Sequence, residues 1–134
     1  MKLTRASNYA LHAVVHLAVK KSDRPIASHN VAQACGIFER FLLKVLKPLV
    51  SVRVLTSIKG PNGGYKLAKP ANEITVLEIV EAVDGDIRGL APFSDPNNPS
   101  LNKKLDNVCA QAAVLVREHL GKVKVSDLMG KRTA

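Results

Sequence analysis

The sequence predicts a mainly α-helical fold that carries one small β-hairpin and a long helix near its C-terminus. Apolar residues recur at helical spacing over most of the chain, and a glycine-rich turn joins two short β-type stretches. A late segment repeats apolar residues in alternating steps of four and three, the spacing of helices that pair along a seam. We expect residues 1–84 to form the first domain, 85–100 a loop, and 101–134 a dimerisation helix and tail.

Two helices are expected before residue 36. Thr4 is a good N-cap for a first helix that runs to about Lys20 with a broad apolar stripe. After a polar link, Ser28 is expected to cap a short second helix. Gly36 should end that helix, because glycine readily adopts the left-handed conformation found at helix C-termini.

The third helix is expected to run from Phe38 to about Ser51. Its inward face is apolar at helical spacing and consists of Phe41, Leu42, Val45, Leu46 and Leu49. Pro48 lies inside this pattern and should kink or tighten the last turns. A helix, a short helix, a glycine turn and a basic helix follow one another in the order of a helix-turn-helix unit.

A β-hairpin is expected after the third helix. Its strands are Leu55–Ile58 and Tyr65–Ala68, joined by the turn Lys59-Gly60-Pro61-Asn62-Gly63-Gly64. Proline presets φ for a tight turn, and the glycine and asparagine residues tolerate positive φ. Lys59 stands at the base of the turn, so the hairpin presents a cation beside the basic helix.

A fourth helix is expected to begin after Thr75 and to end near Asp84. The segment Thr75-Val76-Leu77-Glu78 fits the capping-box pattern, in which the first and fourth residues satisfy each other's backbone N–H groups. Residues 85–100 are rich in Gly, Pro, Asn and Asp and should form the one long loop. Long loops in compact domains are either functional or flexible.

The last long helix should extend from about residue 101 to Leu120. Its pairing seam consists of Leu101, Leu105, Val108, Ala112 and Leu115. So wide an apolar stripe needs a partner beyond a small domain, and homodimerisation is the simplest explanation. The alternative is that the helix folds back on its own domain.

Positive charge is concentrated in the first half of the chain. Residues 1–69 contain twelve Lys or Arg against two acids, a net charge of +10, whereas residues 70–134 contain eight against nine, a net charge of −1. This segregation is typical of a face that binds a polyanion. Arg40, Lys44 and Lys47 share one face of the third helix, and we expect Arg40 to read a base, since Arg makes bidentate contacts to guanine.

Composition excludes several classes of protein. Hydrophobic residues make up 46% of the chain, which argues against wholesale disorder. No segment resembles a signal peptide or a membrane span, so we expect a cytoplasmic protein. Two cysteines form neither a disulfide framework nor a metal motif, and no converging set of acid, base and nucleophile suggests an enzyme.

Several motifs together resemble the Rrf-type bacterial regulators, the IscR/NsrR/CymR-like family. The match includes the opening Lys2-Leu3-Thr4, the Gly36-Ile37 turn and the fourth-helix ending Val80 to Gly85. Its most specific stretch is Lys59-Gly60-Pro61-Asn62-Gly63-Gly64-Tyr65, where the family has a basic residue followed by Gly-Pro-x-Gly-Gly-Tyr. The resemblance implies a winged helix-turn-helix domain with a long dimerisation helix. It also implies a sequence-specific regulator of transcription.

On this resemblance we expect a bacterial homodimer that binds double-stranded DNA at a palindromic operator and acts as a repressor. The third helix would enter the major groove and the wing residue Lys59 the minor groove. The expected DNA-binding residues are Phe38, Glu39, Arg40, Lys44, Lys47, Lys59 and Asn62. Leu43 departs from the family, since polar residues often occupy its position.

No cofactor is expected, although many relatives hold an iron–sulfur cluster through three cysteines in the corresponding loop. Residues 86–104 contain no cysteine, and oxygen or amide ligands replace thiolates poorly in such clusters. The signal could be an unknown small-molecule effector, or Cys109 could act as a thiol sensor. A winged-helix module that binds protein or RNA is the remaining alternative, because the fold alone does not exclude it.

Overall fold

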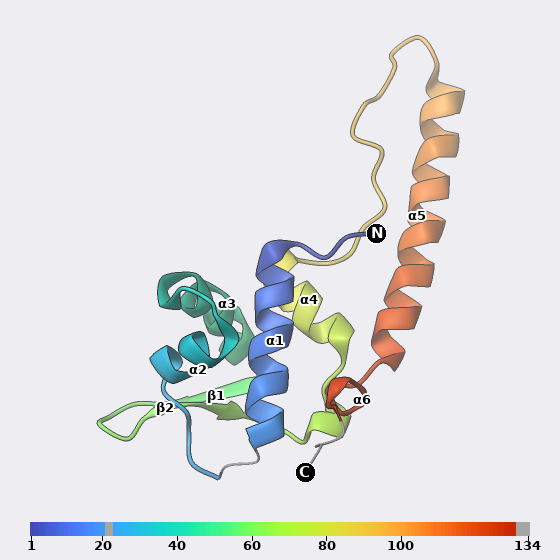
Figure 1. Ribbon diagram of the computed structural model, residues 1–134. Helices are drawn as coiled ribbons and strands as arrows, with labels where there is room; N and C mark the ends of the chain where they lie inside the picture. Colours follow the sequence, from blue (N-terminus) through green and yellow to red (C-terminus); the bar gives the residue numbers. More distant parts are fainter. Residues whose placement is uncertain (21–22, 131–134) are drawn as a thin grey trace.

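The computed structural model describes residues 1–20 and 23–130, shown in Figure 1. Residues 21–22 and most of the predicted basic tail, 131–134, lie outside the described residues. The helices and the hairpin form one body, from which a long helix projects with the loop beside it (Figure 1). The observed fold class is the predicted one, mainly helical with a two-stranded antiparallel sheet.

Three helices build the first half of the body: α1 (Arg5–Lys20), α2 (Ser28–Cys35) and α3 (Glu39–Ser51). The Thr4 cap is confirmed, because its hydroxyl oxygen accepts the Ser7 N–H at 3.0 Å. The predicted cap at Ser28 is wrong. Ala27 occupies the N-cap position, and the Ser28 hydroxyl instead donates to the Glu39 carboxylate of α3 at 2.6 Å.

Helices α2 and α3 both end in Schellman motifs. Gly36 adopts the left-handed conformation with φ of 68°, and the Ile37 N–H reaches back to the Ala32 carbonyl at 3.0 Å. After α3 the same conformation falls on Arg53, with φ of 63°, the one non-glycine residue with positive φ among those described. A side chain there is strained, since the position favours glycine. Helix α3 continues through Pro48 to Ser51.

The hairpin consists of β1 (Leu55–Ile58) and β2 (Gly64–Leu67), paired antiparallel with Leu55 opposite Leu67. It is attached to the body by two backbone hydrogen bonds of 2.9 Å between Ile26 and Tyr65. Gly64 is required at this junction, because its φ is 153° and a Cβ would collide with the Ile26 carbonyl. The wing therefore has a rigid base beside the start of α2.

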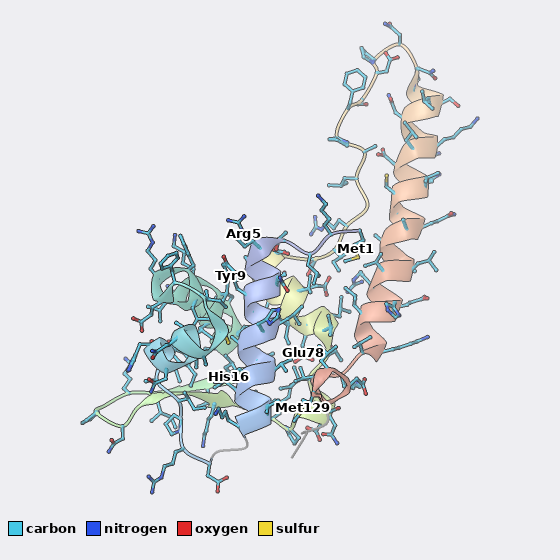
Figure 2. All side chains as sticks on the ribbon, viewed as in Figure 1. Met1, Arg5, Tyr9, His16, Glu78 and Met129 are labelled. Atoms are coloured by element: carbon cyan, nitrogen blue, oxygen red, sulfur yellow. The ribbon has the colours of Figure 1, made fainter. Side chains whose placement is uncertain are left out.

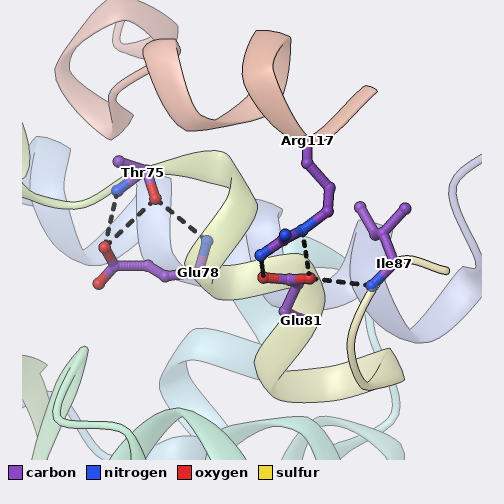
Figure 3. A network of polar contacts seen from close by, with 5 residues as sticks. All are labelled: Thr75, Glu78, Glu81, Ile87 and Arg117. Carbon is purple, nitrogen blue, oxygen red and sulfur yellow. Dashed lines mark hydrogen bonds and ion pairs between the residues drawn. The ribbon is translucent and has the colours of Figure 1, made fainter. Parts of the chain in front are cut away.

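A short 3-10 helix, η1 (Ala71–Glu73), precedes α4 (Val76–Asp84). The predicted capping box is confirmed and is drawn in Figure 3. The Thr75 hydroxyl accepts the Glu78 N–H at 3.1 Å, and the Glu78 carboxylate accepts the Thr75 N–H at 3.3 Å. At the other end of α4, the Asp84 carboxylate accepts the Thr4 and Ser7 hydroxyls, which joins α4 to the start of α1.

Helix α5 (Pro99–Lys122) is followed by the short α6 (Val125–Leu128). The side chain of Asn98 caps α5 by accepting the Leu101 N–H at 3.2 Å. After α5 the chain returns to the body, because Val125 is fully buried and its N–H donates to the Ile74 carbonyl at 2.8 Å. Among the described helices, none is both long and apolar enough to cross a membrane.

The core lies between α1, α3, α4 and the base of the wing. Four of the five residues predicted to face inward from α3 are buried, and Phe41 is half-buried at the edge. The largest fully buried side chains include Leu42, Leu46, Leu49, Leu55, Ile74 and Ile79. This packing fixes the outward face of α3 relative to the wing.

Candidate nucleic-acid interface

The wing and the α2–α3 pair lie on one side of α1, and α5 lies on the opposite side (Figure 1). All of the residues predicted to bind DNA fall on the first side. All seven of these residues are exposed: Phe38, Glu39, Arg40, Lys44, Lys47, Lys59 and Asn62. The structure thus brings α3 and the wing together on one face, although their role in DNA contact stays a prediction.

Basic side chains dominate the outward face of α3. Arg40, Lys44 and Lys47 follow one another at helical spacing and are exposed. The Arg40 guanidinium stands 4.8 Å from the centre of the Phe41 ring, within the range of a cation–π contact. Because this contact restricts the guanidinium, Arg40 is held close to the helix surface before it meets a ligand.

The start of α1 extends this basic face. Arg5 and Tyr9 lie on the side of α1 that faces α3 (Figure 2). Together with Phe41 and Lys44 they line a shallow depression of about 260 Å³. Arg5 therefore adds a cation near Lys44. The two residues are far apart in the sequence, so their proximity could not be predicted from it.

The first turn of α3 carries Phe38 and Glu39. Phe38 is the N-cap residue and its side chain is 77% exposed, although its ring meets the edge of Phe41 at 6.1 Å between centroids. Glu39 accepts the Ser28 hydroxyl at 2.6 Å, a bond that links the two helices of the helix-turn-helix unit. Sequence reasoning had not anticipated this structural use of Glu39.

Lys59 lies at the base of the wing turn, directly after β1, and Asn62 lies within the turn. The turn closes through the Gly63 N–H, which donates to the Gly60 carbonyl at 2.9 Å. A Cβ at Gly63 would collide with the Ile58 carbonyl, so a larger residue would open the turn. Lys59, next to this turn, is exposed.

A groove of about 730 Å³ separates the wing tip from the start of α2. Its lining includes Arg24, His29, Asn30 and Asn62. Helix α2 has no acidic residue in its own first turn and no side-chain cap, but the Glu39 carboxylate of α3 lies 2.6 Å from the Ser28 hydroxyl at this end of the helix. Sequence reasoning missed this groove, because it depends on how the wing docks on Ile26.

Not every lysine near the wing is available to a ligand. Lys69 forms an ion pair with Glu78 of α4 at 2.7 Å. Lys66 is half-buried beside Tyr65. The cations of α3 and Lys59 are exposed, in contrast to these two lysines.

The thiols and imidazoles form no metal centre: among residues 1–20 and 23–130, no three potential His, Cys, Asp or Glu ligands gather. Cys35 is half-buried, and burial raises the pKa of its thiol. Burial, with help from Lys20, lowers the pKa of His16. Cys109 is half-buried in α5, where Gly89 of the loop approaches its carbonyl so closely that a Cβ would collide.

Glu81 connects three elements through its carboxylate, as Figure 3 shows. Its carboxylate accepts the Ile87 N–H at 2.9 Å and two N–H groups of Arg117 at 3.2 and 3.3 Å. Burial works to raise the pKa of Glu81, but the bond from Ile87 and the Arg117 guanidinium outweigh it and leave the pKa below its usual value. Glu81 thereby joins α4 to the loop and to α5.

Glu81→Gln should destabilise the protein slightly at neutral pH and leave it unaffected in acid. Because the folded-state pKa is lowered, the carboxylate contributes stability above the unfolded pKa, and this contribution is lost as pH falls through the folded pKa. The effect should be small, since Arg117 is solvent-exposed. Urea unfolding of both proteins at pH 7 and near pH 3 measures it, and an equal difference at both pH values would contradict it.

Comparison with known proteins identifies the family to which this fold is similar. Residues 3–131 match the model of the Rrf2 family, described as an iron-dependent transcriptional regulator. An HTH-type transcriptional regulator IscR, from Photorhabdus laumondii, is 32% identical over 87 residues, which cover 65% of this chain and 53% of that protein. A Mycobacterium tuberculosis protein classed with the HTH-type transcriptional regulators is 28% identical over 137 residues, which cover 97% of this chain and 82% of that protein.

Among solved structures, CymR, the global cysteine regulator of B. subtilis, superimposes with a TM-score of 0.75. It is 24% identical, and the match covers 96% of this chain and 95% of that one. This likeness shows the fold, including the two-stranded wing and the long C-terminal helix. The aligned segment spans about half of the Photorhabdus IscR, so the remaining part of that relative has no counterpart in the comparison.

Proposed function

The chain belongs to the Rrf2 family of DNA-binding, helix-turn-helix transcriptional regulators, which are not enzymes. From this premise we propose that it acts as a homodimeric repressor on a two-fold symmetric operator. Each protomer would place α3 in the major groove and Lys59 of the wing near the adjacent minor groove. The exposed basic face formed by α3 and the wing supports this arrangement.

The single observation that carries the dimer is the surface of α5. No residue of this helix, all of which is described, is buried, and the predicted seam is open to solvent. Leu105 is 43% exposed, Val108 62% and Leu115 68%. A neighbouring stripe, Cys109, Ala113, Val116 and Leu120, is half-buried towards the body. Helix α5 thus uses one stripe to attach to its own chain and leaves a second one without a partner, which is typical of an interface between copies.

A two-fold dimer would relate two copies of the basic face. Helix-turn-helix dimers bind two half-sites separated by about one turn of duplex, which explains why their operators are palindromic. The position of α5, on the opposite side of α1 from α3 and the wing, leaves the basic face free for DNA when the seam is covered (Figure 1).

The family description names iron, but the residues of this chain do not fit an iron–sulfur cluster. Such clusters are held mainly by thiolates. The loop between α4 and α5 contains no cysteine. Cys35 belongs to α2 and Cys109 to α5, two helices that lie on opposite sides of α1 (Figure 1). We therefore propose a regulator without a cluster, and dialysed protein that held iron and sulfide in stoichiometric amounts would contradict this.

The signal is proposed to act where the loop meets α5. A surface cavity of about 510 Å³ lies between the first residues of the chain, the loop and α5, lined by Leu3, Ile87, Leu90, Cys109 and Val116 among others. An effector bound in this cavity would contact α5, the helix that carries the seam. That Cys109 acts as a thiol sensor stays a prediction. It would be wrong if Cys109→Ser left the affinity for the operator unchanged with every oxidant tested.

Selection of duplexes from a random-sequence pool by the purified protein, followed by sequencing, tests the proposed function. We expect a two-fold symmetric motif with half-sites about one helical turn apart. A pool that stays indistinguishable from the input would overturn sequence-specific binding. An enriched motif without symmetry would overturn the dimer.

A further inference from the structure

Helix α3 carries two large apolar side chains among the residues that face outward. Phe38 is 77% exposed and Leu43 is 41% exposed. The other large apolar residues of α3 are buried or half-buried in the core. Exposed apolar groups on a helix that reads DNA need a separate explanation, because neither contributes to the charge that attracts the duplex.

Leu43 lies at the edge of the basic face, next to Arg40 and Lys47. It follows Arg40 by three residues and precedes Lys47 by four, so that all three share one side of the helix. An apolar protein surface that covered Leu43 would also desolvate these two cations without compensating them. The occupant that suits this side must therefore offer anions and a small apolar group together.

Phe38 is held at the N-terminal end of the same helix. Its backbone is extended at the N-cap position, with φ of −61° and ψ of 131°, and its ring is inclined at 75° to the ring of Phe41. The edge contact limits the motion of the ring while most of its surface stays exposed. The first residues of a recognition helix are the ones that reach base edges.

The major groove presents a single apolar group, the 5-methyl group of thymine. We propose that Leu43 and Phe38 read thymine by contact with this methyl group, each at its own base pair in the half-site that α3 faces. The inference rests on the sequence-specific binding proposed above. Cytosine and uracil lack the methyl group, so both should be discriminated against at these two positions.

The distance between the two residues sets the expected pattern. Five residues of helix correspond to a rise of about 7.5 Å, roughly two base-pair steps. The two methyl-dependent positions should therefore lie close together within each half-site, near the guanine read by Arg40. The same pair of positions should recur in the symmetric half-site.

The test uses the selected duplex, resynthesised with deoxyuridine in place of thymidine. Each duplex carries the replacement at one position of the half-site, and the same replacement is made in the symmetric half-site. Uracil keeps every hydrogen-bonding group of thymine, so the exchange removes only the methyl group. We expect affinity to fall about fourfold for each methyl group lost, the value of burying one such group. The loss should appear at two positions per half-site and be absent elsewhere.

Variants assign each position to its residue. Leu43→Ala should bind the thymine and uracil forms equally at one position, and Phe38→Ala at the other, as in a double-mutant cycle. Leu43→Met keeps an apolar side chain and should retain the discrimination. The matched control is Leu128→Ala, since Leu128 is 44% exposed but lies on α6. It should behave as the unmodified protein does.

Three results would overturn the inference. If the duplex is bound tightly and uracil lowers affinity at no position, the methyl groups are not read, while sequence-specific binding stands. The inference also fails if both alanine variants keep the full sensitivity to uracil. If no duplex is selected at all, the proposed function falls and thymine reading falls with it.

Discussion

Replacement of both Leu105 and Leu115 by glutamate should convert the protein to a monomer and lower its affinity for the operator at least about 100-fold. The two side chains are 43% and 68% exposed in the isolated chain, so the substitutions should leave the fold intact. In the proposed dimer they would bury two carboxylates per protomer in an apolar seam, at a large cost in desolvation. Loss of the second half-site removes the effective concentration that links the two binding events.

Sedimentation velocity measures the assembly and titration of the operator duplex measures the affinity. Val114→Glu is the matched control, because Val114 is 53% exposed on the same helix but lies away from the seam. It should stay dimeric and bind normally. A double variant that remained dimeric, or a control that dissociated equally, would show that α5 does not pair through the predicted seam.

Arg40→Ala should weaken each half-site about 5- to 150-fold, the range expected when one bidentate contact to a base is lost, about 1–3 kcal/mol. The guanidinium is exposed and held over the Phe41 ring, so the change should cost the fold little. The loss should be largest for the selected operator and smaller for unrelated duplexes, because a base contact carries sequence information and a phosphate contact does not.

Two variants distinguish base reading from charge at this position. Arg40→Lys keeps the positive charge but loses the planar fork, so it should lose selectivity while retaining binding to unrelated duplexes. Lys103→Ala removes one exposed cation from the start of α5 and should change neither affinity nor selectivity appreciably. If Arg40→Ala weakened selected and unrelated duplexes by the same factor, Arg40 would be a phosphate contact and the prediction would be wrong.

Local signals in the sequence were enough to predict most helices and the wing. Thr4 and the capping box of Thr75 and Glu78 mark helix starts by side-chain chemistry that acts within four residues. Gly36 marks a helix end in the same way. The wing follows from its turn residues, and the long helix from its apolar repeat. Each of these features depends on neighbours in the chain, so a single sequence contains the information.

What the sequence did not predict depends on contacts between distant segments. Ser28 looked like a helix cap, but its hydroxyl is satisfied by Glu39 of the next helix, which no local pattern signals. The return of Val125 to the core and the contact of Gly89 with the backbone of α5 are likewise long-range. Arg117 and Glu81 meet across 36 residues.

The candidate interface divides in the same way. The basic residues of α3 and Lys59 could be found from spacing and charge, and the structure places them on one exposed face. The groove beside α2 and the position of Arg5 near α3 could not, because both arise from tertiary docking. Leu43 was not among the residues predicted to face inward from α3, and the structure shows that its side chain is 41% exposed.

The mass of the complex between the protein and its selected operator tests the central claim most directly. Native mass spectrometry of a duplex that carries one operator should give two chains of 14.4 kDa for each duplex. Mutation of one half-site should weaken this complex without producing a stable complex of one chain. The proposed dimeric regulator would be contradicted if one chain bound the intact operator and did so no more tightly than it binds an isolated half-site.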